Sequence, residues 1–408
     1  MKKKIFKDVY INLLSSFIFL FAIQILYYPE VSKQFSEHFF GEFIYIITII
    51  NLVGSLIGGT ISNVFLKNYS TWKMNNTHFQ KFSSLLYISI VIFLVFLLGC
   101  LIFNKQQLLG ITFSNQDVLY IFLITLFNQM RVILTTWLRA KLDYKVIFLL
   151  NIVVSGIYCL GWMLLRMNIP LNVFQILFFA EFSFFVVFLL VDKSHIRIFH
   201  VFNKIYEKKL YYSVVLLLFS SIFYTLYKYV DRVLIGHFMS LEFIPIFYVA
   251  NITGLIFAVP FNVLSNVVFS YIAQKNTIEK NQLKLLLYIP FLLFIFLFVI
   301  SSFLGPVLIE HLYPEYYVEA MSIFKILNLG NALLVLDYLI RGFIIKYYSE
   351  GYKVISDFIA LSFFIGVSVV FFESSLVSFA YGYTVGIIVK CLYNYSLLIV
   401  YFRKVIKS

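Results

Sequence analysis

Long apolar stretches separated by short polar connections run through the whole chain. A helix that crosses a hydrocarbon core of about 30 Å needs about 20 mostly apolar residues. Twelve stretches have this character, and in lipid only helices or closed barrels satisfy the backbone polar groups. The predicted helices cover residues 10–28, 43–66, 82–103, 117–137, 146–165, 173–191, 211–236, 244–272, 285–304, 318–344, 354–372 and 376–401. The pattern therefore predicts an all-α integral membrane protein.

The composition supports this prediction. Of the 408 residues, 62% are hydrophobic and 12% are charged, whereas soluble domains have about 45–50% and about 25%. The three cysteines all lie in apolar stretches, which predicts neither a disulfide framework nor a metal site. The first stretch follows a basic start, but no small-residue cleavage site follows Tyr28, so we expect a retained helix.

Lysine and arginine are distributed unequally among the connections. Counted from the first, the odd-numbered connections hold only Lys33, Lys105 and Arg166, whereas the termini and the even-numbered connections hold 23 of the 32 basic residues. Because basic connections stay on the cytoplasmic side, we expect both termini to be cytoplasmic. Topology thus explains the formal net charge of +13. The expected partners of these charges are anionic membrane lipids, not nucleic acid.

The two halves of the chain resemble each other. Phe43-Ile-Tyr-Ile through Ser62-Asn-Val aligns without gaps on Ile246-Phe-Tyr-Val through Ser265-Asn-Val, at an offset of half the chain. Internal repeats are common in transporters. We therefore predict two six-helix bundles related by a pseudo-twofold axis along the membrane normal. The N-terminal bundle covers residues 1–192, a cytoplasmic linker 193–210, and the C-terminal bundle 211–408.

Ionisable residues within the predicted helices are functional candidates, because each costs about 2.5–3.5 kcal/mol on insertion scales. The basic candidates are Arg131, Lys228, Arg232, Lys325, Arg341 and Lys390, accompanied by the acids Glu181, Asp231 and Asp337. The rise per residue of about 1.5 Å places Lys228, Asp231, Arg232 and Lys325 in the outer half of the membrane. Arg131, Lys390, Asp337 and Arg341 then lie in the inner half, and Glu181 lies near the middle.

Sequence spacing suggests partners for some of these charges. Asp231 shares a helical face with Lys228 and Arg232 and could neutralise them, while Arg232 could also reach the headgroups. Asp337 and Arg341 are spaced for a similar pair. Lys325 and Lys390 have no acidic residue one turn away, so we expect each to need an aqueous cavity or an anion.

Glu181 has no basic residue nearby in its own helix. Three interpretations stay open: a protonated and hydrogen-bonded carboxyl, a partner of a basic group on another helix, or a carboxylate that couples transport to an ion. Amide and hydroxyl side chains within the helices, such as Gln24, Asn51 and Asn251, could bind sugar hydroxyls. They could equally connect helices to one another, which is their commoner use.

Several short motifs resemble those of one transporter family. They are Asn12-Leu-Leu-Ser-Ser, Pro29 with Lys33 and Gly41, Asp231-Arg-Val-Leu-Ile-Gly236 with Tyr248-Val-Ala250, Leu312-Tyr-Pro-Glu-Tyr316 and Gly351-Tyr-Lys353. In these the chain resembles the Wzx-type polysaccharide flippases, within the superfamily that also holds multidrug-and-toxin extruders (MATE). The resemblance implies a V-shaped pair of six-helix bundles around a central cavity. It also implies that an undecaprenyl-pyrophosphate-linked oligosaccharide crosses the bacterial cytoplasmic membrane, from the inner to the outer leaflet, by alternating access.

A pyrophosphate that crosses a region of low dielectric constant needs cations near it. Arginine can donate two parallel hydrogen bonds to a phosphate group, whereas lysine acts as a point charge. We therefore expect Arg131, Lys228, Arg232, Lys325 and Lys390 to bind the substrate and Asp231 to position its neighbours; the resemblance itself reaches only Asp231 and Arg232. Glu181 is the candidate for coupling to H⁺ or Na⁺. We expect no metal and no other cofactor, and as partners the lipid-linked oligosaccharide, membrane lipids and the machinery that polymerises O-antigen, capsule or another surface polysaccharide.

Two alternatives belong to other functional classes. An exporter of small cationic or amphipathic molecules with the same fold would be expected to line its cavity with acids, and the excess of basic residues disfavours it. A membrane glycan polymerase or acyltransferase would need catalytic residues in sizeable outer loops, whereas the outer connections here are short and their acids and histidines show no recognised spacing. We therefore expect a transporter and not an enzyme.

Overall fold

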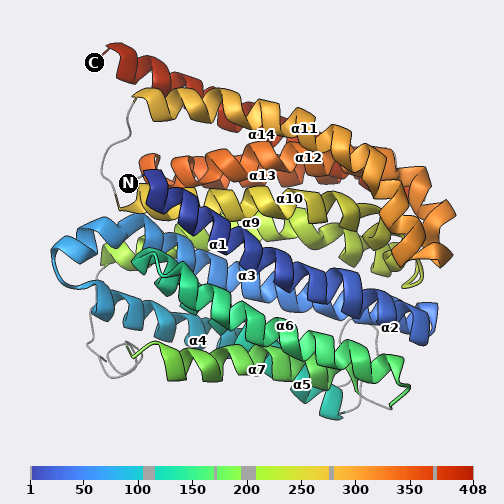
Figure 1. Ribbon diagram of the computed structural model, residues 1–408. Coiled ribbons are helices and arrows are strands. Elements are labelled where there is room, and N and C mark those ends of the chain that lie inside the picture. Colours follow the sequence, from blue (N-terminus) through green and yellow to red (C-terminus); the bar gives the residue numbers. More distant parts are fainter. Residues whose placement is uncertain are drawn as a thin grey trace. The chain divides into compact units, whose positions relative to one another are not determined.

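The computed structural model describes residues 2–103, 115–169, 172–193, 208–274, 280–370 and 375–407. In these ranges all regular structure is helical (Figure 1). The elements are α1 (Lys2–Leu20), the π-helical stretch η1 (Phe21–Tyr27), α2 (Tyr28–Gln34), α3 (Glu37–Met74), α4 (His78–Phe103), α5 (Asn115–Lys141), α6 (Tyr144–Arg166), α7 (Val173–Val191), α9 (Lys208–Phe238), α10 (Phe243–Ala273), α11 (Lys280–Leu312), the 3₁₀ turn η2 (Pro314–Tyr316), α12 (Tyr317–Tyr347), α13 (Glu350–Val370) and α14 (Leu376–Lys407).

Within the described ranges, twelve helical segments are long and apolar enough to cross a membrane. This confirms the predicted fold class and the number of spans. Several spans are longer than the apolar stretches that predicted them: the stretch 43–66 lies inside Glu37–Met74, and the stretch 10–28 lies inside Phe6–Gln34. The extra turns are polar, and sequence hydropathy does not detect a helix that continues beyond the hydrocarbon core.

Some predicted features fall outside the described residues. They are Lys105 and most of the predicted linker, residues 194–207. The predicted division of the chain at 193–210 therefore stays a prediction. The side chain of Cys100 is not described either, whereas Cys159 and Cys391 are free cysteines.

Packing divides the chain into two compact units. Unit 1 contains Met1–Phe35 and Ile46–Leu218, and unit 2 contains Ser36–Tyr45 and Phe219–Ser408. The helices α3 and α9 each contribute residues to both units. The internal packing of each unit determines which polar groups meet.

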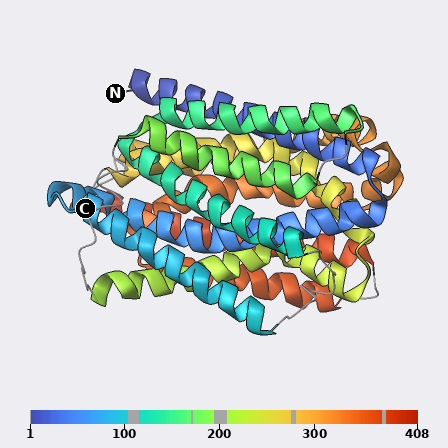
Figure 2. The ribbon, with the colours of Figure 1, turned by 90° about the horizontal axis from the view of Figure 1, so that it is seen from below.

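In unit 1, α1 packs on α6, and α7 packs on both α5 and α6. Figures 1 and 2 show α6 running beside α1 in two perpendicular views. Aromatic side chains fill the core where α3, α4 and α5 meet: the ring centroid of Phe82 lies 4.8 Å from that of Phe65 and 4.9 Å from that of Trp137. Since large buried rings dominate core energetics, this cluster fixes α5, which carries Arg131.

In unit 2, α12 packs against α10, α11 and α14, and α13 packs against α14. In the span that contains α12, 78% of an 18-residue apolar segment is buried, whereas in the span of α11 the share is 17%. Asn331 on α12 donates to Asn251 Oδ1 over 2.6 Å, and Tyr383 on α14 donates to Asn331 Oδ1 over 2.9 Å. These bonds connect three helices, which is the structural use of membrane amides. They make α12 the central helix of the unit.

Candidate functional site

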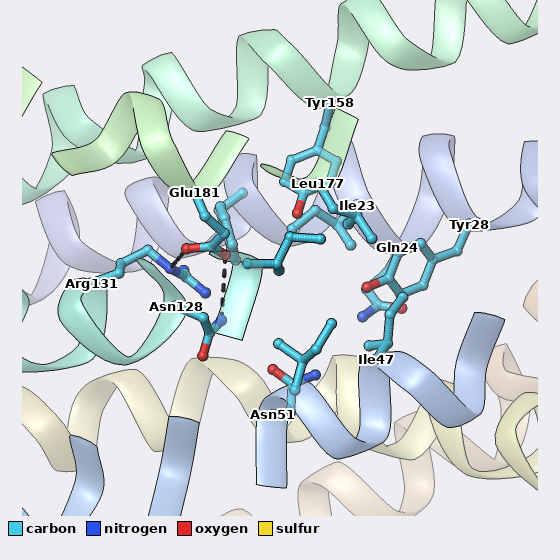
Figure 3. A pocket seen from close by; sticks show the side chains of 13 residues that line it. Ile23, Gln24, Tyr28, Ile47, Asn51, Asn128, Arg131, Tyr158, Leu177 and Glu181 are labelled. Carbon is cyan, nitrogen blue, oxygen red and sulfur yellow. Dashed lines mark hydrogen bonds and ion pairs between the residues drawn. The ribbon is translucent and has the colours of Figure 1, made fainter. Parts of the chain in front are cut away.

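Unit 1 holds a polar cavity of about 120 Å³, with lining residues from α1, η1, α2, α3, α5, α6 and α7. Figure 3 shows Glu181, Arg131 and Asn128 together at one end and Gln24 and Tyr28 at the other. A water molecule occupies about 30 Å³ in the liquid. The cavity therefore has room for a few waters or for one polar group of a larger ligand.

The carboxylate of Glu181 on α7 receives both of its contacts from α5. Arg131 Nε lies 2.8 Å from Glu181 Oε2, and Asn128 Nδ2 donates to Glu181 Oε1 over 3.3 Å. Asn128 and Arg131 are three residues apart and so share one face of α5. Of the three interpretations left open, the structure shows the partner of a basic group on another helix. The predicted role in ion coupling stays a prediction.

Aromatic rings hold the arginine from the other side. The Arg131 guanidinium lies 4.9 Å from the ring centroid of Phe19, a cation–π contact. The Phe19 ring meets Tyr158 edge to face at 6.4 Å. Glu181 is 4% exposed, whereas the Arg131 side chain keeps 20% exposure. The arginine is thus the member of the pair that a ligand in the cavity can reach.

The rest of the cavity lining combines amides and a phenol with apolar side chains. The Asn51 amide has no hydrogen-bond partner among the described residues, although it lines the cavity. Amides beside aromatic rings suit a ligand with hydroxyl groups and an apolar face. The guanidinium and the carboxylate at one end suit a ligand that carries charge.

Unit 2 contains a second group of buried ionisable residues, which we call the charge network: Asp337 and Arg341 on α12, Lys353 and Asp357 on α13, and Lys390 on α14. Lys390 Nζ lies 3.0 Å from Asp337 Oδ2 and 3.1 Å from Asp357 Oδ1. Lys353 forms a further ion pair with Asp357 one turn away. Apart from Arg341, the members of the network are at most 3% exposed.

Neutral side chains donate further hydrogen bonds to the two carboxylates. Asn394 Nδ2 donates to Asp337 Oδ1 over 2.9 Å, and Ser220 on α9 donates to Asp357 Oδ2 over 2.7 Å. Ser356 donates to Asn394 Oδ1 over 2.8 Å and so orients that amide. Four helices of unit 2 therefore meet at this network.

Two expectations about these charges are wrong. We expected Lys390 to lack an acidic partner, yet it has two, because they come from α12 and α13 and not from its own helix. We expected Asp337 to pair with Arg341, yet Asp337 pairs with Lys390 and Asn394. The Arg341 guanidinium instead lies 4.2 Å from the ring centroid of Tyr224 on α9.

Lys353 and Asp357 are functional candidates that the sequence analysis missed. The predicted helix began at residue 354, so Lys353 counted as part of a cytoplasmic connection. The observed span instead begins at Gly351. The signal that could have found them is the i, i+4 spacing of a lysine and an aspartate at the start of an apolar stretch.

The three charged residues of α9 are not paired in the predicted way. Asp231 is 1% exposed, and neither of its carboxylate oxygens has a hydrogen-bond partner in the described part of the chain. Lys228 Nζ lies 5.0 Å from the ring centroid of Tyr229, and the Arg232 guanidinium lies 5.5 Å from that of Tyr248. Aromatic faces therefore contact both cations.

Lys325 stands apart from the other candidates. It lies on α12 with an exposed side chain. Of the predicted site residues, the structure brings together Arg131 with Glu181, and Lys390 with the charge network. Lys228, Asp231 and Arg232 lie together on α9, and their predicted contact with a substrate stays a prediction.

No protein-family model and no curated relative matches the sequence. The fold, however, is similar to that of solved transporter structures. The TM-score is 0.71 with an outward-facing multidrug resistance MATE family transporter of the MOP superfamily, at 12% identity over 98% of this chain and 97% of that one. It is 0.73 with MATE in the straight conformation, at 11% identity over 100% and 97%. An inward-facing MATE transporter gives 0.60, at 10% identity over 96% of both chains. These likenesses show a MATE-like fold over essentially the whole chain, as the sequence predicted.

Proposed function

We propose that this protein is a flippase of lipid-linked oligosaccharides. It would move undecaprenyl-pyrophosphate-linked units from the inner to the outer leaflet of a bacterial cytoplasmic membrane, for the synthesis of a surface polysaccharide. Transporters with this fold have been solved in outward-facing and inward-facing conformations, which supports transport by alternating access. The proposal includes cytoplasmic termini and no catalytic step.

The observation that carries the proposal is the excess of cationic groups within the spans. Beyond the first two residues of each predicted helix, the sequence places six basic residues and four acidic ones, Glu181, Asp231, Asp337 and Asp357. The observed span from Gly351 adds Lys353, so basic residues remain in excess. Buried charges need compensation. An anionic substrate group would supply it, and a diphosphate accepts hydrogen bonds from arginine and lysine readily.

The proposal assigns a role to each predicted site residue. Lys228, Arg232 and Lys325 are proposed to contact the anionic substrate, with Asp231 positioning its neighbours on α9. Arg131 is proposed to bind the substrate from the cavity of unit 1, since it is the exposed member of its ion pair. Lys390 is also proposed to belong to the substrate site. Because it is fully buried and ion-paired with Asp337 and Asp357, we propose that it acts by its charge and does not contact the substrate directly.

Glu181 is proposed to couple transport to a proton or a sodium ion. Its carboxylate contacts Arg131 and Asn128, so proton or cation binding at Glu181 would compete with the ion pair. Release of Arg131 would then make the guanidinium available to the substrate. This links ion binding to substrate binding within one cavity.

One observation favours a second candidate function, the export of a small molecule. The cavity of about 120 Å³ in unit 1 is small and contains a buried carboxylate, which suits a small cationic or amphipathic compound. The same fold occurs in a multidrug resistance transporter. Efflux of fluorescent cationic dyes from cells that produce the protein would distinguish this function from flipping.

The leaflet position of the lipid-linked oligosaccharide tests the leading proposal. In spheroplasts that lack the protein, we expect the intact unit to accumulate on the cytoplasmic side, protected from an externally added glycosidase. Wild-type protein should restore access, and the variant Glu181→Gln, at equal abundance, should restore it poorly. If the unit reaches the outer leaflet normally without the protein, the flippase proposal is wrong. If single units accumulate outside, a polymerase is favoured instead.

A further inference from the structure

The charge network of unit 2 contains more positive than negative groups. Its acids are Asp337 and Asp357, and its bases are Arg341, Lys353 and Lys390. The charged groups with the largest electrostatic effect on Lys353 and Lys390 belong to this set. With every member ionised, the network therefore carries one excess positive charge inside a membrane protein, where uncompensated charge is expensive.

The excess charge can be assigned to one residue. Asp337 contacts Lys390 and Asn394, and Asp357 contacts Lys353, Lys390 and Ser220. Both carboxylates therefore already have a cationic partner other than Arg341.

Arg341 has no ion pair and no hydrogen bond to any described residue. Its guanidinium only faces the Tyr224 ring, at 4.2 Å. The same ring lies 4.5 Å from Lys390 Nζ and 5.2 Å from Lys353 Nζ. A cation–π contact is a weak attraction, and one ring shared by three cations cannot replace a counter-ion. The five N–H donors of Arg341 therefore lack an acceptor.

Exposure identifies Arg341 as the accessible member of the network. Lys353 is 3% exposed, and Lys390 and Asp357 are fully buried, whereas Arg341 is partly exposed. Its planar guanidinium can form two parallel bonds to one phosphate group. Lys353 and Lys390 are buried, so they would attract an anion at Arg341 without contacting it.

We propose that Arg341 is an anion-binding residue that grips a phosphate group, with Lys353 and Lys390 as positioning residues held by the two aspartates. The assignment of that phosphate to the diphosphate of a lipid-linked oligosaccharide rests on the function proposed above. The presence of an anion site does not rest on it. The two parts can therefore be tested separately.

The first experiment measures binding of inorganic pyrophosphate to the full-length protein in lipid nanodiscs by calorimetry. Arg341→Gln should weaken binding at least about tenfold, or about 1.4 kcal/mol, because it removes a charge-assisted contact to the phosphate. Arg341→Lys keeps the charge and loses the planar fork, so its affinity should lie between those of Arg341→Gln and the wild type. The matched control is Arg403→Gln, the same change at an exposed position on α14, which should bind as the wild type does.

Thermal unfolding of the same samples shows whether each variant is folded. Arg341→Gln removes the excess charge without exposing a carboxylate, so its Tm should equal or exceed that of the wild type. If Arg341→Gln binds pyrophosphate as tightly as Arg403→Gln, or if the wild type does not bind pyrophosphate, the anion site is wrong. If Arg341→Gln does not fold, the pyrophosphate affinity of Arg341→Lys is compared with that of the wild type. Equal affinities would then mean that the anion site is wrong.

The second experiment identifies the source of the phosphate. Arg341→Gln is tested in the spheroplast assay for the leaflet position of the lipid-linked unit. Retention of the unit on the cytoplasmic side, together with lost pyrophosphate binding, supports the diphosphate of the substrate. Normal flipping by a variant that no longer binds pyrophosphate overturns that assignment and indicates a free phosphate-bearing anion. Failure of the flippase proposal itself would appear separately, in cells that lack the protein.

Discussion

Arg131 and Glu181 form the ion pair that organises the cavity of unit 1. Replacing Arg131 with alanine leaves Glu181, which is 4% exposed, without its cation. Breaking a buried pair costs about 3–5 kcal/mol. The partial exposure of Arg131 lowers this, so we expect a loss of roughly 2–3 kcal/mol. Thermal unfolding in detergent measures it, with Arg166→Ala as the exposed control.

The double variant Arg131→Ala with Glu181→Gln tests whether the stability lost in Arg131→Ala comes from the unpaired carboxylate of Glu181. Because a neutral amide can stay buried at lower cost than a carboxylate, the second change should recover part of the lost stability. A double variant that is less stable than Arg131→Ala alone would contradict the view that the pair dominates this site.

Two buried aspartates of unit 2 should differ in their response to the same substitution. Asp357 contacts Lys353, Lys390 and Ser220, so Asp357→Asn should destabilise by roughly 3–5 kcal/mol. Asp231 is equally buried but has no hydrogen-bond partner among the described residues. Asp231→Asn should therefore change stability by less than about 1 kcal/mol, or increase it.

The comparison of their Tm values tests this contrast under identical conditions. Equal losses for the two variants would mean that Asp231 has a stabilising partner after all. A loss confined to Asp357→Asn would mean that the charge network is a structural element of unit 2 as well as the support of Arg341.

Helix packing around α12 depends on a glycine of α10. A Cβ at Gly254 would lie 2.5 Å from Asn331 Nδ2 and 2.7 Å from Asn331 Cβ, both closer than normal contacts. Gly254→Ala should therefore overpack the α10–α12 contact and destabilise by about 1–3 kcal/mol. Gly59→Ala on α3 is the matched control, since a Cβ there meets nothing within 4 Å. Its higher helix propensity should make it neutral or stabilising by up to about 1 kcal/mol.

Unfolding of the two alanine variants distinguishes packing from propensity. Displacement of Asn331 should also disturb its bonds to Asn251 and Tyr383. If Gly254→Ala is as stable as Gly59→Ala, the helices adjust to the extra methyl group, and the close approach of α10 to α12 is not required.

Helices were predictable from the sequence because membrane spans are long and apolar, so hydropathy alone locates all twelve. Helix ends were less predictable: Lys353 lies one residue before its predicted helix yet inside the observed span. Polar first and last turns carry no apolar signal. This is why Lys353 was missed, whereas Asp357 lay inside the predicted helix 354–372 and its spacing to Lys353 was overlooked.

Partners between helices were not predictable from one sequence. Lys390 and Asp337 are separated by 53 residues, and Arg131 and Glu181 by 50. Spacing rules apply only to residues on the same helix face, and they assigned Asp337 to Arg341 incorrectly. Which helix faces another depends on packing of the whole unit. The types of buried charge could thus be predicted, whereas their pairing could not.

The orientation of the whole molecule makes a further prediction. The termini and the even-numbered connections carry 23 of the 32 basic residues, and basic connections stay cytoplasmic. The turns at Asn76, after α3, and at Asn168, after α6, both contain a residue with positive φ. We expect Asn76 on the cytoplasmic side and Asn168 on the outer side.

Alkaline phosphatase folds only outside the cytoplasm, so its fusions report this orientation. A fusion after Asn168 should be active, whereas fusions after Asn76 and after Ser408 should be inactive at equal abundance. The reverse pattern would place the basic connections outside. It would also invert the predicted depths of Arg131 and Arg341, so that the phosphate grip proposed for Arg341 would face the outer leaflet and serve release of the substrate, not its capture. The direction of transport in the proposal therefore depends on this result.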